Sequence, residues 1–455
     1  MTPSRLVPAA LGGVLLALAP APASAAQGRA TTVVGEISAF NASLPPEARA
    51  EKSSRMKESV LAFYRGTNHL FWKDLGGSPL LLPYGGVPAT RTWLSGDAHP
   101  DNTGAFDDDQ GDIVFALNDF DEAVIGDYQL DVWRMAIGLV LVARERGVFD
   151  AAKEGALVDA FTEAYLDTLA GYADNGGENT RKFMAHNTSG LLDEFLEDVA
   201  ASNSRRKLLE RWTVKVNGAR RFGLAGQPDL AAVPPAVDAD LRARMGTYRS
   251  TLGGGDWPTG YFGVKDVAQR LHAGLGSLGT LRYYVLIEGA SASPEDDRVL
   301  EVKAQRAPSA WPYLAPEAVS QTRTVCGDTM ALRTVLAAKA LGYRVDDHLG
   351  WVTLADGLGY SVRELSPWRA AFPTERLDTV PRFKHLAEQW GQVLATQHAR
   401  ADRDWNPAVL PTSLDGEVHA RTDGHHADFR AHVRALATDY ATQVRLDYES
   451  FRASP

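Results

Sequence analysis

Two short acidic segments near residue 100 constrain the fold of this chain more than any other feature. The first is Ser95-Gly96-Asp97-Ala98-His99-Pro100-Asp101-Asn102, and the second is Leu117-Asn118-Asp119-Phe120-Asp121-Glu122-Ala123. Residues 92–94 and 113–117 are β-prone and apolar, and the polar run 107–112 has the composition of a turn. The sequence therefore predicts strands that flank the acidic segments, with a hairpin between the two segments.

The residue types in these segments resemble the catalytic and metal-binding loops of kinase-like phosphotransferases. An Asp is followed five residues later by an Asn, and a further Asp ends the second apolar strand. The resemblance implies that Asp97 accepts or orients the proton of an acceptor hydroxyl. It also implies that Asn102 and Asp119 hold Mg²⁺ or Mn²⁺, with Asp121 as an alternate ligand. Such a sparse set suits magnesium, which takes its other ligands from substrate phosphates and water.

A third segment, Gly126-Asp127-Tyr128-Gln129-Leu130-Asp131, follows these two in order. In aminoglycoside and choline kinases a G-D-x-x-x-D segment at this relative place braces the catalytic loop, so the order favours the kinase-like interpretation. One alternative is that these acids only cap turns and helices, as Asp and Asn commonly do. Another is a two-metal phosphoesterase, because Asp97-Ala98-His99 has the form that opens such sites. The matching G-D-x-x-D and G-N-H-D segments are absent.

A glycine-rich segment lies almost two hundred residues further along. Gly274, Gly276, Ser277 and Gly279 precede the β-prone run 281–288, and Lys303 is near the end of the next such run. Glycine lets backbone N–H groups approach phosphates closely, and Lys303 has the spacing of the kinase phosphate-binding lysine. Because a strand follows the glycines, a dinucleotide-binding fold is disfavoured. The alternative is a plain hairpin with an exposed lysine.

The order of these regions is the reverse of that in ordinary kinases, and a circular permutation would reconcile it. The predicted helix over 380–400 resembles the one that normally runs into the catalytic loop. We therefore expect an α/β (α+β), two-lobed, kinase-like fold. A helical lobe over 26–264 carries the catalytic and metal loops (96–123), a β-rich nucleotide-binding lobe covers 265–366, and C-terminal helices over 367–455 complete the helical lobe.

Four segments together resemble the bacterial family described as domain of unknown function 2252, and the resemblance covers roughly residues 50–450. They are Phe63-Tyr64-Arg65-Gly66, residues 96–102, residues 118–123 and residues 274–280. This resemblance implies no activity directly. The chain also departs from kinases, because Ser95 stands where His is common. Cys326-Gly327-Asp328 occupies the place of the glutamate that holds the kinase lysine.

The N-terminus predicts export. Arg5 gives a positive start, Leu6 to Ala19 form a short apolar run, and Ala23-Ser24-Ala25 resembles a cleavage site. We expect residues 1–25 to be a removed secretory signal and the protein to be periplasmic or extracellular. The run is too short for a spanning helix, and no cysteine lies beside it for a lipid, so no stable membrane anchor is expected. Cys326 is the only cysteine and is expected to be buried.

These observations predict a metal-dependent phosphotransferase that moves a phosphoryl, or alternatively a nucleotidyl, group from ATP. The acceptor, a small molecule or a protein, and the oligomeric state stay open, and the net charge of −10 argues against nucleic acid as a partner. The rival is an exported, non-catalytic pseudokinase, favoured by the missing glutamate and by the scarcity of ATP outside the cell. The intact Asp97, Asn102 and Asp119 oppose that rival, and a phosphoesterase ranks third.

Overall fold

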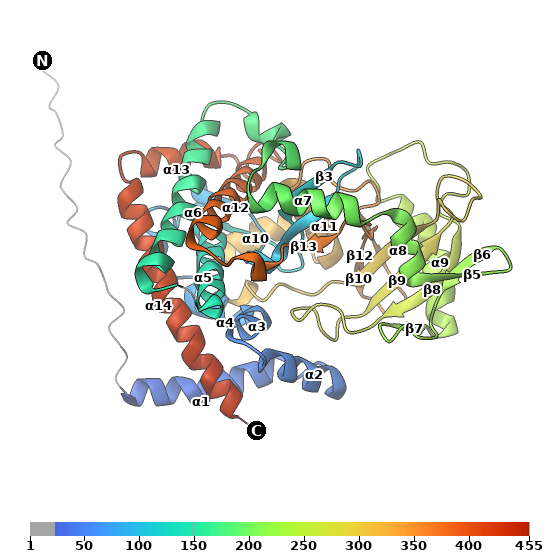
Figure 1. Ribbon diagram of the computed structural model, residues 1–455, viewed down its shortest axis with the longest axis horizontal. Helices are drawn as coiled ribbons and strands as arrows, with labels where there is room; N and C mark the ends of the chain where they lie inside the picture. Colours follow the sequence, from blue (N-terminus) through green and yellow to red (C-terminus); the bar gives the residue numbers. More distant parts are fainter. Residues whose placement is uncertain (1–22, 148, 455) are drawn as a thin grey trace, which may run out of the picture.

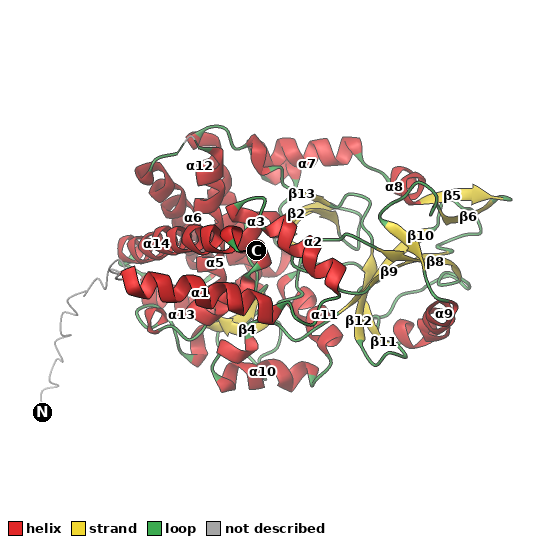
Figure 2. Ribbon diagram, turned by 90° about the horizontal axis from the view of Figure 1, so that it is seen from below, coloured by secondary structure: helices red, strands yellow, loops and turns green. Residues whose placement is uncertain are grey.

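Helices gather at one end of the molecule and an antiparallel β-sheet forms the other (Figures 1 and 2). The computed structural model describes residues 23–147 and 149–454. The α-helices are α1 (Ala23–Phe40), α2 (Pro46–Met56), α3 (Val60–Gly66), α4 (Asn68–Leu75), α5 (Gln129–Arg146), α6 (Ala151–Tyr172), α7 (Leu191–Ser202), α8 (Arg205–Trp212), α9 (Pro235–Arg249), α10 (Pro316–Cys326), α11 (Met330–Leu341), α12 (Val380–Arg400), α13 (Leu414–Thr422) and α14 (His426–Ala453). The fold is a mixture of α and β structure, as predicted.

The strands form one large sheet and three small ones. Their bounds are β1 (Arg91–Leu94), β2 (Thr103–Asp107), β3 (Ile113–Leu117), β4 (Val124–Asp127), β5 (Thr213–Val216), β6 (Ala219–Phe222), β7 (Leu230–Ala232), β8 (Val264–Arg270), β9 (Arg282–Ile287), β10 (Arg298–Ala304), β11 (Gly350–Thr353), β12 (Gly359–Glu364) and β13 (Ala370–Ala371). The large sheet has the order β11-β12-β10-β9-β8-β7, and the small ones have the orders β1-β4, β13-β2-β3 and β5-β6.

The large sheet is covered on both faces. Val285 and Val302 pack on one face with Tyr248 of α9, whereas Tyr284 and Val299 pack on the other with residues of α8. This arrangement follows from the period of two in a strand. Strand β7 and helix α9 precede the expected boundary at residue 265, so the β-rich part of the structure begins earlier in the chain than residues 265–366.

Helix α5 forms the centre of the helical end. Its residues from 129 to 143 are all buried, α6 and α14 pack against it, and α12 packs in turn against α6. The apolar spacing of residues 129–146 and 151–172 predicts two helices, and α5, α6 and α12 confirm these bounds and those of the helix predicted over 380–400. The sequence over 47–75 also predicts helical structure, and the chain forms α2, α3 and α4 there. The Ser59 side chain accepts a hydrogen bond from Ala62 N and so starts α3. The sequence over 190–212 likewise predicts helical structure, and Ser204 caps α8 in the same way, so this stretch is divided into α7 and α8.

The two acidic segments occupy loops between small strands. The hairpin of β2 and β3 lies between them, and β13 adds a third strand beside β2. The strand predicted over 92–94 pairs antiparallel with β4. These short pairings fix both loops to the helical end. Cys326 is buried, as expected.

The predicted export signal, residues 1–25, lies almost entirely outside the described residues, and α1 begins at Ala23. Within residues 23–147 and 149–454, no helix combines the length and the apolar character needed to cross a membrane.

Candidate functional site

A cavity of about 420 Å³ brings the two acidic loops and the glycine-rich segment together. The predicted residues that line it are Asp97, Asn102, Asp119, Asp121, Gly274, Gly276 and Ser277. Asp97 and Asn102 come from the loop between β1 and β2, the other two acids follow β3, and the glycine-rich segment joins β8 to β9. Gly279 is not part of the lining and instead packs against Leu44 and Ala48. Residues far apart in sequence therefore meet at one cavity.

One oxygen of Asp97 is held by a buried arginine. Arg134 of α5, which is 1% exposed, donates from Nε and Nη2 to Oδ1 of Asp97 at 2.9 and 2.6 Å. Its guanidinium also lies 3.7 Å from the centre of the Tyr64 ring. Burial disfavours the charged carboxylate, but the charges of Arg134 and His99 outweigh burial and hold the pKa of Asp97 well below its usual range. Asp97 is therefore an anion that orients groups and a weak proton acceptor.

The backbone of the Asp97 loop is fixed from two sides. Asp131 accepts hydrogen bonds from Ser95 N at 2.7 Å and from Gly96 N at 3.2 Å, which is the bracing expected of the G-D-x-x-x-D segment. On the other side, Asn102 Nδ2 donates to the carbonyl oxygen of Asp97 at 3.0 Å. That bond turns the Asn102 side chain so that, among the described residues, its Oδ1 accepts no hydrogen bond. The amide oxygen is thus free to bind a cation.

Lys303 reaches the second acidic loop. Its ammonium forms an ion pair with Asp121 and lies 3.9 Å from Oδ1 of Asp119. Gln305 adds a hydrogen bond to Asp121 at 3.0 Å. Burial of Asp121 is outweighed by Lys303, so the pKa of the Asp121 carboxyl is lowered. Lys303 and Asp119 are therefore adjacent, and the permuted, kinase-like arrangement stays a prediction.

No helical glutamate is paired with Lys303 among the described residues. Helix α11 contributes Arg333, which is buried and donates to the carbonyl oxygens of Asp121 and Ala123. It therefore fixes the acidic loop itself.

Lys52 is a candidate functional residue that the sequence reasoning missed. It lies on α2, is 4% exposed and lines the cavity. Its ammonium lies 5.6 Å from the centre of the Phe40 ring, and no other described residue gives it a hydrogen bond or an ion pair. Burial, together with the charge of Arg306, lowers the pKa of Lys52 to about 8, although the charges of Glu122 and Asp97 oppose the shift. A buried ammonium with no direct anionic partner is costly, and here it faces the place where an anionic ligand would bind.

Asn102 and Asp119 fit a magnesium ion better than Asp121 does. Both present oxygen atoms to the cavity, and Asp119 is only partly covered at 31% exposure of its side chain. Asp121 is already neutralised by Lys303. Two other groups in the described part of the chain have metal-like composition, Asp346-His348-Glu364 and Glu163-Asp167-His426. Each already contains an ion pair with arginine, and neither lines this cavity.

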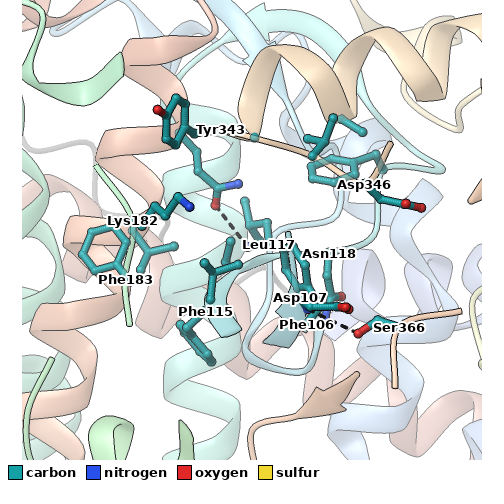
Figure 3. Close-up of a pocket in the computed structure, with 18 of the residues that line it drawn as sticks. Phe106, Asp107, Phe115, Leu117, Asn118, Lys182, Phe183, Tyr343, Asp346 and Ser366 are labelled. Carbon is teal, nitrogen blue, oxygen red and sulfur yellow. Dashed lines mark hydrogen bonds between the residues drawn. The ribbon is translucent and has the colours of Figure 1, made fainter. Parts of the chain in front are cut away.

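A smaller cavity of about 120 Å³ lies behind the β2–β3 hairpin (Figure 3). Phe115, Leu117 and Phe183 give it a largely apolar wall, and Asp107 N donates to Ser366 Oγ at 3.3 Å beside it. Ligand pockets usually enclose about 300–1,000 Å³, so we assign this space to packing around the hairpin.

Gly96→Ala is expected to separate the two acidic loops. Gly96 has a φ of +76°, and an added Cβ would overlap the carbonyl oxygen of Glu122. Gly111, at the tip of the hairpin, has a φ of +81° with nothing within 4 Å of an added Cβ. Both changes therefore cost about 1 kcal/mol for the left-handed backbone, and only Gly96→Ala adds a clash. Denaturant unfolding should show a loss of unfolding free energy at least about twice as large for Gly96→Ala as for Gly111→Ala. Equal losses would mean that the two acidic loops are not in contact.

Comparison with known proteins identifies a family and no activity. No curated protein and no solved structure matches the chain. A family model described as an uncharacterized protein conserved in bacteria matches residues 45–454, which include the whole lining of the cavity except part of α1 and its loop. The chain belongs to this bacterial family, DUF2252.

Proposed function

We propose that this protein is a Mg²⁺-dependent phosphotransferase with a circularly permuted, kinase-like arrangement, and that it acts after export and removal of residues 1–25. It would move a phosphoryl group from ATP to a hydroxyl acceptor. The observation that carries the proposal is the convergence of Asp97, Asn102 and Asp119 on one cavity beside the glycine-rich segment, with Lys303 outside the lining but 3.9 Å from Asp119. Capping of turns alone would not require these residues to meet.

Each residue has a role that its position supports. Asn102 and Asp119 would hold the metal ion, which would neutralise phosphate charge. The backbone N–H groups of Gly274, Gly276 and Ser277 would lie against phosphates, and Lys303 would exchange Asp121 for a phosphate oxygen. Asp97 would orient the acceptor hydroxyl with the oxygen that Arg134 leaves free. Orientation is the main contribution required of the protein in phosphoryl transfer.

The end of α12 supports the permutation. Trp93 N donates to Ala401 O at 3.4 Å, and Thr92 Oγ1 donates to His398 O at 2.8 Å. The last turn of α12 therefore lies directly beside β1, the strand that runs into the Asp97 loop. In an unpermuted chain the corresponding helix would continue into that loop, and here contact in space replaces the covalent link.

Asp119→Asn is expected to remove the magnesium-dependent part of ATP binding. A ligand at a hundred times its Kd stabilises the folded state by about 2.7 kcal/mol, so a thermal-shift titration with ATP should respond to Mg²⁺ in the wild type. Loss of the ligand carboxylate should weaken this response by more than about tenfold. Asp328→Asn is the control, because Asp328 is 87% exposed and does not line the cavity. An unchanged response in Asp119→Asn would refute the ligand role.

The second candidate is a non-catalytic nucleotide-binding protein. It is favoured by the low pKa of Asp97, which makes this carboxylate a weak base, and by the absence of a helical glutamate beside Lys303 among the described residues. The two candidates differ in one measurement. Binding of Mg–ATP without consumption of ATP or a mass increase of 80 Da on any acceptor tested would favour the binding protein.

A further inference from the structure

A second cavity, of about 380 Å³, adjoins the candidate site on the other side of the glycine-rich segment. The two cavities share Gly274 and Arg369. The second cavity lies between α8 and the face of the large sheet that carries Tyr284. A ligand in it would therefore lie next to the phosphates proposed for the first cavity.

The charge of this second cavity is opposite to that of the whole chain. Its cationic side chains are Lys207, Arg211, Arg270, Arg282 and Arg369, and Glu301 is its one carboxylate within the described residues. The chain as a whole has a net charge of −10. Positive charge is thus concentrated in a concave site, where field lines are focused and anions are attracted.

Internal ion pairs balance these cations only in part, and Arg270 is the one that pairs with a described carboxylate outside the cavity, Asp229 at 3.2 Å. Glu301, which is buried, accepts from Arg282 at 2.8 Å, from Arg363 at 3.0 Å and from Arg369 at 3.3 Å, so one negative charge serves three arginines. Although burial opposes its ionisation, these arginines hold the pKa of Glu301 well below its usual range. At neutral pH Glu301 therefore carries one negative charge, and the three arginines around it carry more positive charge than it can balance.

The rim of the cavity on α8 adds cations without acidic partners. Arg211 lies 4.7 Å from the centre of the Trp212 ring, and Lys207 donates only to the carbonyl oxygen of Ser202 at 2.6 Å; neither forms an ion pair with a described carboxylate. Arg206 on the same helix does have one, Glu210, at 3.5 Å. The unpaired cations of α8 are therefore the ones that line the cavity.

Arg282 links this cavity to the glycine-rich segment. It donates to Ser277 Oγ at 3.1 Å as well as to Glu301. Lys303 lies opposite Arg282 in the pairing of β9 with β10 and belongs to the same face of the sheet as Glu301. The uncharged base of a nucleotide would require an apolar pocket. This face of the sheet instead carries charged side chains.

We propose that the basic cavity is a subsite for the acceptor and that it binds a phosphate or carboxylate group of a small anionic molecule. This proposal rests on the proposed phosphotransferase function and specifies its substrate class. Arginine pairs with carboxylate and phosphate through two parallel hydrogen bonds, and the enclosed volume suits a small molecule better than a polymer. An acceptor held there by its anionic group would extend its hydroxyl past Gly274 toward Asp97.

The test uses pyrophosphate and citrate as probes of the intact protein, in thermal-shift titrations against NaCl at equal ionic strength. The variant Lys207→Gln/Arg211→Gln removes the two rim cations and leaves the Arg282–Glu301 pair intact. Arg206→Gln is the matched control on the same helix. We expect the double variant to weaken binding of both probes by at least tenfold, with the control unchanged. Binding that is unaltered in the double variant, or no binding in the wild type, would overturn the proposal.

A phosphate probe can also enter the proposed nucleotide site. Two further experiments distinguish binding there from binding in the basic cavity. With saturating Mg–ATP present, citrate should still stabilise the protein; if ATP abolishes the response, the probes occupy the nucleotide site and the proposal fails. Asp119→Asn should leave citrate binding unchanged. If the protein binds no ATP but loses citrate binding in the double variant, the proposed phosphotransferase function fails while the anion site stands.

Discussion

Lys52→Met is expected to make the protein more stable and, at the same time, to remove most of its response to Mg–ATP. The pKa of Lys52 is lowered from 10.5 to about 8 by burial. Since one pKa unit corresponds to about 1.4 kcal/mol, keeping this ammonium charged costs roughly 3 kcal/mol at neutral pH. Methionine has a similar length and no charge, so it should recover much of that energy. The phosphates would lose a cation that is already in place.

The pH dependence of this gain has a definite sign. Between about pH 8 and 10.5 the unfolded state keeps the Lys52 proton while the folded state releases it. The stability that Lys52 costs the wild type is therefore recovered as the pH rises through this window. The variant lacks this contribution, so its advantage should be largest below pH 8 and should shrink toward pH 10.5.

Denaturant unfolding at pH 7 and pH 10, together with the ATP titration, measures both effects. Lys384→Met on α12 is the control, because Lys384 is exposed and does not line the cavity. A variant that is stabilised but binds Mg–ATP normally would show that Lys52 is only a buried defect. A variant that is destabilised would show that its contact with Phe40 matters more than its charge.

Features that depend on local pattern could be predicted from the sequence. The bounds of α5, α6 and α12 follow from long runs of apolar spacing, and the hairpin at 107–112 follows from its turn composition. The brace from Asp131 to Ser95 was expected from the G-D-x-x-x-D segment, since these residues are separated by a single strand pair. Such features need only short-range geometry, which spacing encodes directly.

The partners of the site residues could not be predicted in the same way. Lys303 and Asp121 are 182 positions apart, and only the folded chain shows that Lys303 pairs with this aspartate rather than with a helical glutamate. Lys52 has no sequence signal at all, because it belongs to a helix rich in charged residues and would ordinarily be solvated. Arg134 did leave a signal, because it is a charged residue within the apolar run of α5 and such a residue is expected to pair with a buried anion.

That anion is Asp97, and Arg134→Met is expected to destabilise the protein by about 3–5 kcal/mol. The change leaves a mostly buried carboxylate without its counter-charge and removes a cation from the face of the Tyr64 ring. Asp97→Asn should also destabilise, because Arg134 is then unpaired. The double variant should be more stable than the sum of the two single losses indicates, by at least about 1 kcal/mol. Strict additivity would mean that the two side chains do not interact.

Acid titration separates this ion pair from simple loss of packing. The folded-state pKa of Asp97 lies below its usual value near 3.8, so the stability it contributes is complete above that value and is lost as the pH falls toward the lower folded-state pKa. Without Arg134, only His99 still opposes the effect of burial on Asp97, so the pKa of Asp97 rises and protonation relieves the variant as the medium becomes acidic. The gap in stability between the wild type and Arg134→Met should therefore narrow from pH 7 to pH 4. If the difference in stability stays constant, the loss in Arg134→Met comes from packing and not from the ion pair. Asp97 would then be free to act as an ordinary base.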